Sequence, residues 1–167
     1  KYGSRKTVAA RMLAVVNHVD ELYRSLGIRV MLVGLEIWTY GDQIEVSPNP
    51  DVTLERFMAW RQQTLLPRTK HDNAQFITDV DFIGNTVGLA NVLIPSLVGF
   101  LLQDHNDNAI GVATTLAHEM GHNLGLSHDA PGCVCRSSQP QTTPSTFIYC
   151  IYFNSLLVYY QKSTDLL

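Results

Sequence analysis

The segment from His118 to His128 constrains this chain more than any other, because it fits the pattern H-E-x-x-H-x-x-G-x-x-H at every specified position. Residues i and i+4 lie on one face of a helix, so a helix here places His118 and His122 side by side. Gly125 lets the chain leave the helix, because glycine accepts the positive φ that such a terminus often needs. His128 can then return as a third ligand. Catalytic zinc needs three protein ligands and one open position, which this pattern supplies.

Glu119 projects beside the two helical histidines, where a carboxylate can take a proton from water held at such a metal. A lone His-x-x-x-His pair on a helix is often just two ordinary histidines, but the complete pattern is far more specific. We therefore assign Glu119 as the catalytic base and His118, His122 and His128 as ligands of one catalytic Zn²⁺. The remaining histidines lack this spacing and are predicted to be surface or capping residues: His18, His71 and His105.

Composition favours one globular domain over residues 1–167, because hydrophobic residues make up 46% and charged residues 16% of the chain. The net charge is −3 without a basic run, which gives nucleic-acid binding no electrostatic support. No apolar run reaches the roughly 20 residues of a membrane span, and nothing in the sequence implies an oligomer. The chain opens on Lys1 without a signal peptide, so we expect it to be part of something longer.

Strands alternating with helices predict an α/β or α+β sandwich. Thr53 is predicted to cap the second helix, and the polar-flanked strand 86–90 is predicted to lie at the sheet edge. Residues 131–144, rich in Pro, Ser, Thr and Gln, are predicted to be an irregular loop. Hydrophobic periodicity predicts helices over 5–26, 53–66, 109–124 and 153–161, and strands over 28–38, 74–78 and 86–90.

Longer stretches give the chain a family resemblance. It resembles the catalytic domain of the ADAM metalloproteases, the adamalysin or reprolysin type within the metzincins. Asp129, directly after the third histidine, is typical of reprolysins within that clan. The resemblance is carried by VNHVDELYRSLGIRVMLVGLEIW (16–38), VSPNPDVTLERFMAWR (46–61), HDNAQFIT (71–78), TVGLA (86–90) and ATTLAHEMGHNLGLSHD (113–129).

The resemblance implies a zinc endopeptidase with a twisted, mostly parallel sheet, a horizontal cleft and Glu119 as the water-activating glutamate. It also implies an edge strand at that cleft, with which an extended peptide or protein substrate pairs as one more strand. The residues of that strand, and hence the candidate substrate-binding residues, are Thr86, Val87, Gly88, Leu89 and Ala90.

Two parts of the family pattern are missing. Family members begin with a strand of the type YVELxIVVD, which lies inside the sheet, and this chain begins after it; its neighbours should therefore lack backbone partners. The family also has a C-I-M sequence, the Met-turn beneath the metal, yet no methionine follows Met120. Either Cys150-Ile151-Tyr152 is an altered C-I-M, or residues 147–150 match a later F-S-x-C element and the Met-turn is deleted. We favour the second alignment.

The cysteines and a calcium site follow from this alignment. Three cysteines leave at least one unpaired, and disulfide use in an oxidising compartment is favoured over metal binding. The second alignment implies a Cys133–Cys150 disulfide, with Cys135 unpaired and Asp165 where the family has its last cysteine. Reprolysins often bind structural Ca²⁺. Asp72 matches one ligand, but the others lie on the missing strand and near Asp165, so a complete Ca²⁺ site is not expected.

Two functions follow. The first is a zinc metalloendopeptidase that cleaves extended segments of extracellular or membrane-tethered proteins, as in ectodomain shedding, within a cell-surface or extracellular, membrane-anchored parent protein. The second is a catalytically impaired domain that binds zinc or protein partners without efficient proteolysis. Intact Glu119 favours the first. The missing strand, the missing Met-turn and the missing disulfide of the family's last cysteine favour the second, and residues 136–167 are the divergent C-terminal part. An adhesion module would be cysteine-dense, which this chain is not.

Overall fold

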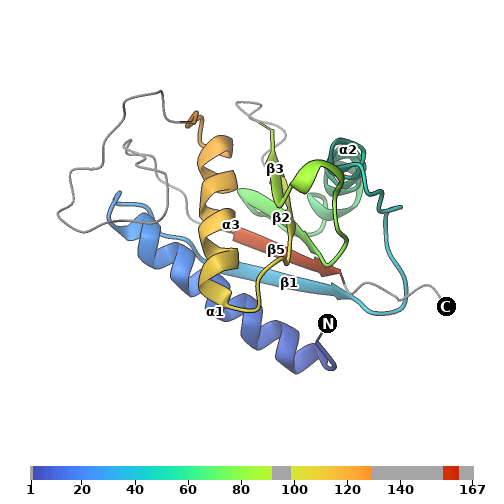
Figure 1. The fold of residues 1–167 in the computed structure, drawn as a ribbon, viewed down its shortest axis with the longest axis horizontal. Helices are drawn as coiled ribbons and strands as arrows, with labels where there is room; N and C mark the ends of the chain where they lie inside the picture. Colours follow the sequence, from blue (N-terminus) through green and yellow to red (C-terminus); the bar gives the residue numbers. More distant parts are fainter. Residues whose placement is uncertain (1, 92–98, 129–155, 162–167) are drawn as a thin grey trace.

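A computed structural model describes residues 2–91, 99–128 and 156–161 as a sheet with helices on both faces (Figure 1). A π-helical turn, Arg61–Leu65, continues α2, and a 3-10 turn covers Ile83–Asn85. No helix within the described ranges is long and apolar enough to cross a membrane. The main elements are α1 (Arg5–Arg24), β1 (Leu32–Trp38), α2 (Pro50–Trp60), β2 (Asn73–Thr78), β3 (Gly88–Ala90), β4 (Gly99–Gln103), α3 (Ala109–Asn123) and β5 (Leu156–Gln161).

The sheet has five strands in the order β1-β5-β2-β4-β3. Its pairings are parallel except at β3, which runs antiparallel to β4 with Gly88 opposite Leu102 and Ala90 opposite Phe100. The prediction that strand 86–90 lies at the edge is therefore confirmed for β3. The mixed α/β class and the mostly parallel sheet also agree with expectation.

The two faces of the sheet carry different helices. On one face α1 and α3 pack on each other and on Ile77, Phe100 and Leu102; they cross in Figure 1. On the other face α2 packs on Phe76 and Leu101. Neighbouring residues of β2 and β4 thus point to opposite faces, as the two-residue period of a strand requires. Because both faces are covered, every residue of β2 is buried, including the polar Asn73, Gln75 and Thr78, and only Gln103 of β4 is partly exposed.

Helix α1 is the support on which α3 rests. The helix predicted there is confirmed. Full burial of one of its large apolar side chains contributes about 1.5–3 kcal/mol. Tyr23, also buried, donates a hydrogen bond from its hydroxyl to the backbone oxygen of Ala117 at 2.6 Å. Ala117 directly precedes His118, so this bond fixes α1 against the turn of α3 that carries the motif. The buried apolar residues facing α3 and the sheet are Val8, Met12, Val15, Val16 and Val19.

The start of α2 differs from the prediction. The helix begins at Pro50, and its cap is Asn49, whose side chain accepts a hydrogen bond from the Asp51 N–H at 3.0 Å. Proline at the first helical position favours a start there, because its missing N–H would have no partner anyway. Thr53, predicted as the cap, is instead buried in the first turn. Its hydroxyl donates to the Ser47 carbonyl and accepts from the Ser47 N–H.

Two strands differ from the sequence-based assignment. Strand β4 was not predicted, and residues 153–161, predicted as a helix, contain β5. The helix prediction is wrong because a short apolar run fits a buried strand as well as a helix, and only tertiary pairing decides. Strand β5 pairs in parallel with β1 and β2. It therefore lies inside the sheet, which also corrects the expectation that the neighbouring strands there lack partners. The predicted loop 131–144 lies outside the described residues.

The carboxylate of Asp20 joins α1 to the segment that leads into β1. It accepts hydrogen bonds from Arg29 Nε at 2.9 Å, from the Val30 N–H at 2.8 Å and from Arg24 at 2.9 Å. These bonds, that of Arg29 above all, hold the pKa of Asp20 well below its ordinary value of 3.8 despite its burial. A lowered pKa means that the stabilisation is complete above the unfolded-state value and is lost as the pH falls below it.

We expect Asp20→Asn to lower the free energy of unfolding at pH 7 by about 2 kcal/mol, the scale of hydrogen bonds to a charged group. Between roughly pH 5 and pH 2 the variant should lose less stability than the parent, because it lacks the titrating group. Urea unfolding followed by circular dichroism at several pH values measures both effects. Glu21→Gln, at the exposed neighbouring carboxylate, is the control. Equal pH dependence of parent and Asp20→Asn would contradict the assignment.

Candidate metal centre

The C-terminus of α3 turns as the sequence predicts. Gly125 has φ of 89°, a conformation that glycine adopts without strain. Its N–H donates to the His122 carbonyl at 2.9 Å, and the Leu126 N–H donates to the Gly121 carbonyl at 3.0 Å. This pair of bonds is the Schellman motif, which satisfies carbonyls at the end of a helix. The turn reverses the chain and brings His128 back toward α3.

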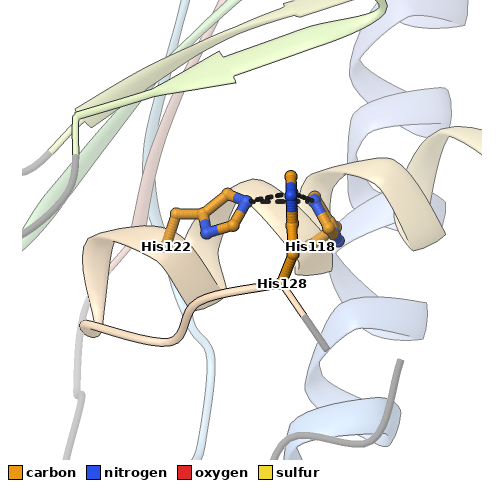
Figure 2. Close-up of side chains that lie close together, drawn as sticks. All are labelled: His118, His122 and His128. Carbon is orange, nitrogen blue, oxygen red and sulfur yellow. Dashed lines mark hydrogen bonds between the residues drawn. The ribbon is translucent and has the colours of Figure 1, made fainter. Parts of the chain in front are cut away.

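The three histidines of the motif converge (Figure 2). His118 and His122 project from α3, and His128 reaches them from the segment after the turn. The Nε2 atoms of His118 and His122 are 3.0 Å apart, and those of His128 lie 3.1 Å from His118 and 3.0 Å from His122. Within the described ranges, no other group of three or more histidine, cysteine or acidic side chains has the spacing of metal ligands.

The hydrogen bond at His122 and the burial of His118 both suit zinc binding. His122 Nδ1 lies 2.7 Å from the Leu126 carbonyl, which can only accept, so Nδ1 carries the proton and Nε2 of the neutral ring offers its lone pair to the group. Burial, with the neighbouring His122 and His128, lowers the pKa of His118 and favours the neutral form that a ligand needs. Two ligands of tetrahedral zinc are roughly 3.3 Å apart, close to the observed separations. The donor set fits one Zn²⁺.

Glu119 lies between the metal centre and the edge strand. Its side chain is 7% exposed, and burial raises the pKa of its carboxyl to about 7. A group with such a pKa can take up and release a proton near neutral pH. Gly88 of β3 packs directly against it, since a Cβ placed on Gly88 would lie only 2.5 Å from Glu119 Oε1. Gly88 was assigned from sequence as a substrate-binding residue, but its contact with Glu119 was not foreseen.

The other edge-strand residues lie around this contact. Thr86 and Val87 precede β3, and the Val87 carbonyl accepts from the Gln103 N–H at 2.9 Å. Leu89 packs on the α2 side of the sheet, and Ala90 on the α3 side. The segment 86–90 therefore runs past Glu119 along the sheet edge.

Several predicted residues lie apart from the centre. Asp72 is exposed and joins no ligand group within the described residues. Cys133, Cys150 and Asp165 lie outside the described residues.

Of the histidines outside the motif, His105 is exposed and His18 half-buried. His71 is buried, so its surface prediction is wrong. Its Nδ1 donates to the Thr69 carbonyl at 2.8 Å and its Nε2 accepts from buried Arg61 at 2.9 Å. The reason is that a buried guanidinium needs acceptors.

Two asparagines beside the centre escaped sequence reasoning. Asn123 is the last residue of α3 and occupies an unspecified position of the motif, and Asn73 opens β2 and is fully buried. Their side chains are hydrogen bonded to each other at 2.8 Å. The burial of Asn73 would have indicated that its amide has a partner. Hydrophobic periodicity does not reveal that a polar residue at the start of a strand is buried.

Comparison with known proteins gives one consistent answer. The sequence model described as "Reprolysin (M12B) family zinc metalloprotease" matches residues 1–151. Disintegrin and metalloproteinase domain-containing protein 19 of Mus musculus is 45% identical over 153 residues, which cover 84% of this chain and 16% of that protein. Protein 15 of the same series, from Homo sapiens, is 46% identical over 148 residues, 86% of this chain and 17% of that protein. The chain thus spans about a sixth of the length of these curated relatives.

We expect the purified chain to hold one zinc ion after dialysis. His122→Ala should abolish zinc binding, because two imidazoles hold zinc far more weakly than three. Atomic emission spectroscopy gives the zinc content per chain. His105→Ala removes an exposed histidine outside the group and should keep the parent's zinc. Stoichiometric zinc in His122→Ala would show that the metal binds elsewhere.

Proposed function

Because the chain belongs to the reprolysin (M12B) family of zinc metalloproteases, we propose that residues 1–167 form a metalloendopeptidase domain that cleaves extended segments of extracellular or membrane-tethered proteins. The observation that carries this proposal is the convergence of three imidazole Nε2 atoms next to the buried Glu119. We place the domain at the cell surface or outside the cell, as part of a longer, membrane-anchored protein.

The chemistry divides between metal and carboxylate. His118, His122 and His128 would hold the zinc, which would supply Lewis acidity to polarise a peptide carbonyl and to lower the pKa of a water molecule. Glu119 accepts a proton from the attacking water at its carboxylate as the carbon–oxygen bond forms. It then gives that proton to the departing amide nitrogen as the carbon–nitrogen bond breaks. Its raised pKa supports this double role, because the carboxyl exchanges protons near neutral pH.

The substrate would lie along β3. That strand pairs only with β4 among the described strands, so its other edge offers backbone groups to an extended peptide, as in β-strand addition. The side chains of such a peptide alternate between two directions. A pocket of about 580 Å³ between β3 and α2 suits one of them. Among its lining residues are Leu54, Met58, Leu89 and Ala90.

A catalytically impaired domain is the second candidate. The observation that favours it is the absence of any methionine after Met120, because the Met-turn that the resemblance implies beneath the metal is then altered or missing. Loss of groups that support a metal site typically costs about 10–100-fold in affinity or activity. Such a chain would keep its histidine ligands and bind zinc or a protein partner while cleaving poorly.

We expect Glu119→Gln to keep the zinc content of the parent and to lower hydrolysis of a fluorogenic peptide by about 10²–10⁴-fold, the usual contribution of a general base. Glutamine keeps the shape of the side chain but cannot accept the proton. Zinc content and steady-state turnover are measured on the same samples. An active parent unaffected by this change would contradict the mechanism. A parent that holds zinc but cleaves no peptide would support the impaired domain.

We expect Gly88→Ala to fold normally and bind zinc, but to lose about 10²-fold in turnover, the scale of an ångström-sized misplacement. The added Cβ would come within 2.8 Å of Oε1, Cγ and Cδ of Glu119. A flexible side chain can move away, so stability should barely change while the base is displaced. Gly3→Ala is the control, because a Cβ there meets nothing within 4 Å. Full turnover in Gly88→Ala would show that Glu119 needs no fixed position.

A further inference from the structure

The end of the edge strand is tied to the zinc-binding helix by side-chain amides. Asn123, the last residue of α3, donates from Nδ2 to the backbone carbonyl of Asn91 at 2.8 Å. Asn91 directly follows β3. Asn73 of β2 donates from its own Nδ2 to Asn123 Oδ1, also at 2.8 Å. One half-buried side chain thus connects the strand β2, the helix α3 and the end of the edge strand.

The direction of these bonds is set by the Asn91 carbonyl. A carbonyl only accepts, so Asn123 must turn its NH₂ toward Asn91 and its oxygen toward Asn73. Asn73 must then present its own NH₂ to Asn123. This arrangement leaves Oδ1 of the fully buried Asn73 without a hydrogen-bond partner, which is energetically costly. An isosteric aspartate at position 123 could accept from Asn73 but could not donate to Asn91.

These contacts fix β3 against α3 at both ends. At the start of the strand, Gly88 packs on Glu119; just past its end, Asn91 is bonded to Asn123. Asn123 directly follows the ligand residue His122, so the turn of α3 that holds a metal ligand also holds the strand. A peptide paired with β3 would therefore keep one position relative to the histidines.

We propose that Asn123 is a positioning residue that holds the edge strand at a fixed place beside the histidine group, so that an extended substrate paired with β3 presents its scissile bond to the metal and to Glu119. The inference rests on the proposed function for the identity of the ligand, an extended peptide. The tie between Asn123 and the strand is independent of that function.

Hydrogen exchange of the zinc-loaded full chain tests the tie without any turnover. Asn123→Asp and Asn123→Ala should raise exchange at the amides of residues 87–91 and of Gln103 by about 2–10-fold, the scale of one lost hydrogen bond. Amides of α1 should be unchanged. Asn108→Asp makes the same substitution at the cap of the same helix, where the side chain accepts from the Ile110 N–H as a carboxylate also can. Unchanged exchange at 87–91 in both variants would overturn the proposal.

Binding measurements in the Glu119→Gln background test the link to substrate, because cleavage of the probe is expected to be about 10²–10⁴-fold slower there. A fluorescein-labelled extended octapeptide should bind about 10-fold more weakly when Asn123→Asp or Asn123→Ala is added, if one aligned hydrogen bond governs the strand's position. Acetohydroxamate, a compact zinc chelator that does not need β3, should bind within about 2-fold of the background variant. Equal loss for both probes would mean that Asn123 acts through the metal site, which would overturn the positioning role. A peptide that does not bind even the background variant contradicts the substrate assignment, and the exchange rates alone then decide the tie.

Discussion

The sheet depends on the pairing of β5 with both of its neighbours. Among the described strands β1 pairs with β5 alone, and β5 connects it to β2, so the order β1-β5-β2-β4-β3 would fall into two parts without it. Buried backbone groups that lack partners are costly, and β1 and β2 would each present a row of them. The strand that completes the sheet comes from the far end of the chain, after the whole of 129–155. Formation of the sheet therefore requires β5 to pair with strands far away in the sequence, and the entropic cost of such a closure rises only slowly with the separation.

The metal centre is held in place because α3, which carries two of its histidines, packs on that sheet. The inner face of the helix, Val112, Leu116 and Met120, is fully buried against α1 and the strands. The bond from Tyr23 to Ala117 fixes the helix one residue before the first ligand. Residues on the opposite side of the same turns, His118 and His122, are left to face the third histidine. The amphipathic period that buries one side of α3 thus also aims its ligands.

Sequence reasoning succeeded where structure is determined locally. The motif predicts the helix, the turn at Gly125 and the convergence of three histidines, because each depends on residues within a few positions of one another. It failed for β5, since a run such as LLVYY fits a strand or a helix until its neighbours are known. It also missed the reason for Gly88, whose requirement for a small residue comes from Glu119 across space. The hydrogen bond between the amides of Asn73 and Asn123 was missed for the same reason, because the two residues are far apart in the sequence.

This division between local and distant determinants separates metal binding from catalysis. The ligands need only α3 and its C-terminal turn, so a chain with this motif can hold zinc even where the surrounding fold has changed. The proposed turnover demands more, because Glu119 packs against Gly88 and Asn123 is bonded to Asn91 at the end of β3, both across gaps in sequence. An intact motif therefore supports zinc binding more strongly than it supports proteolysis, and the position of the edge strand decides between the two candidate functions.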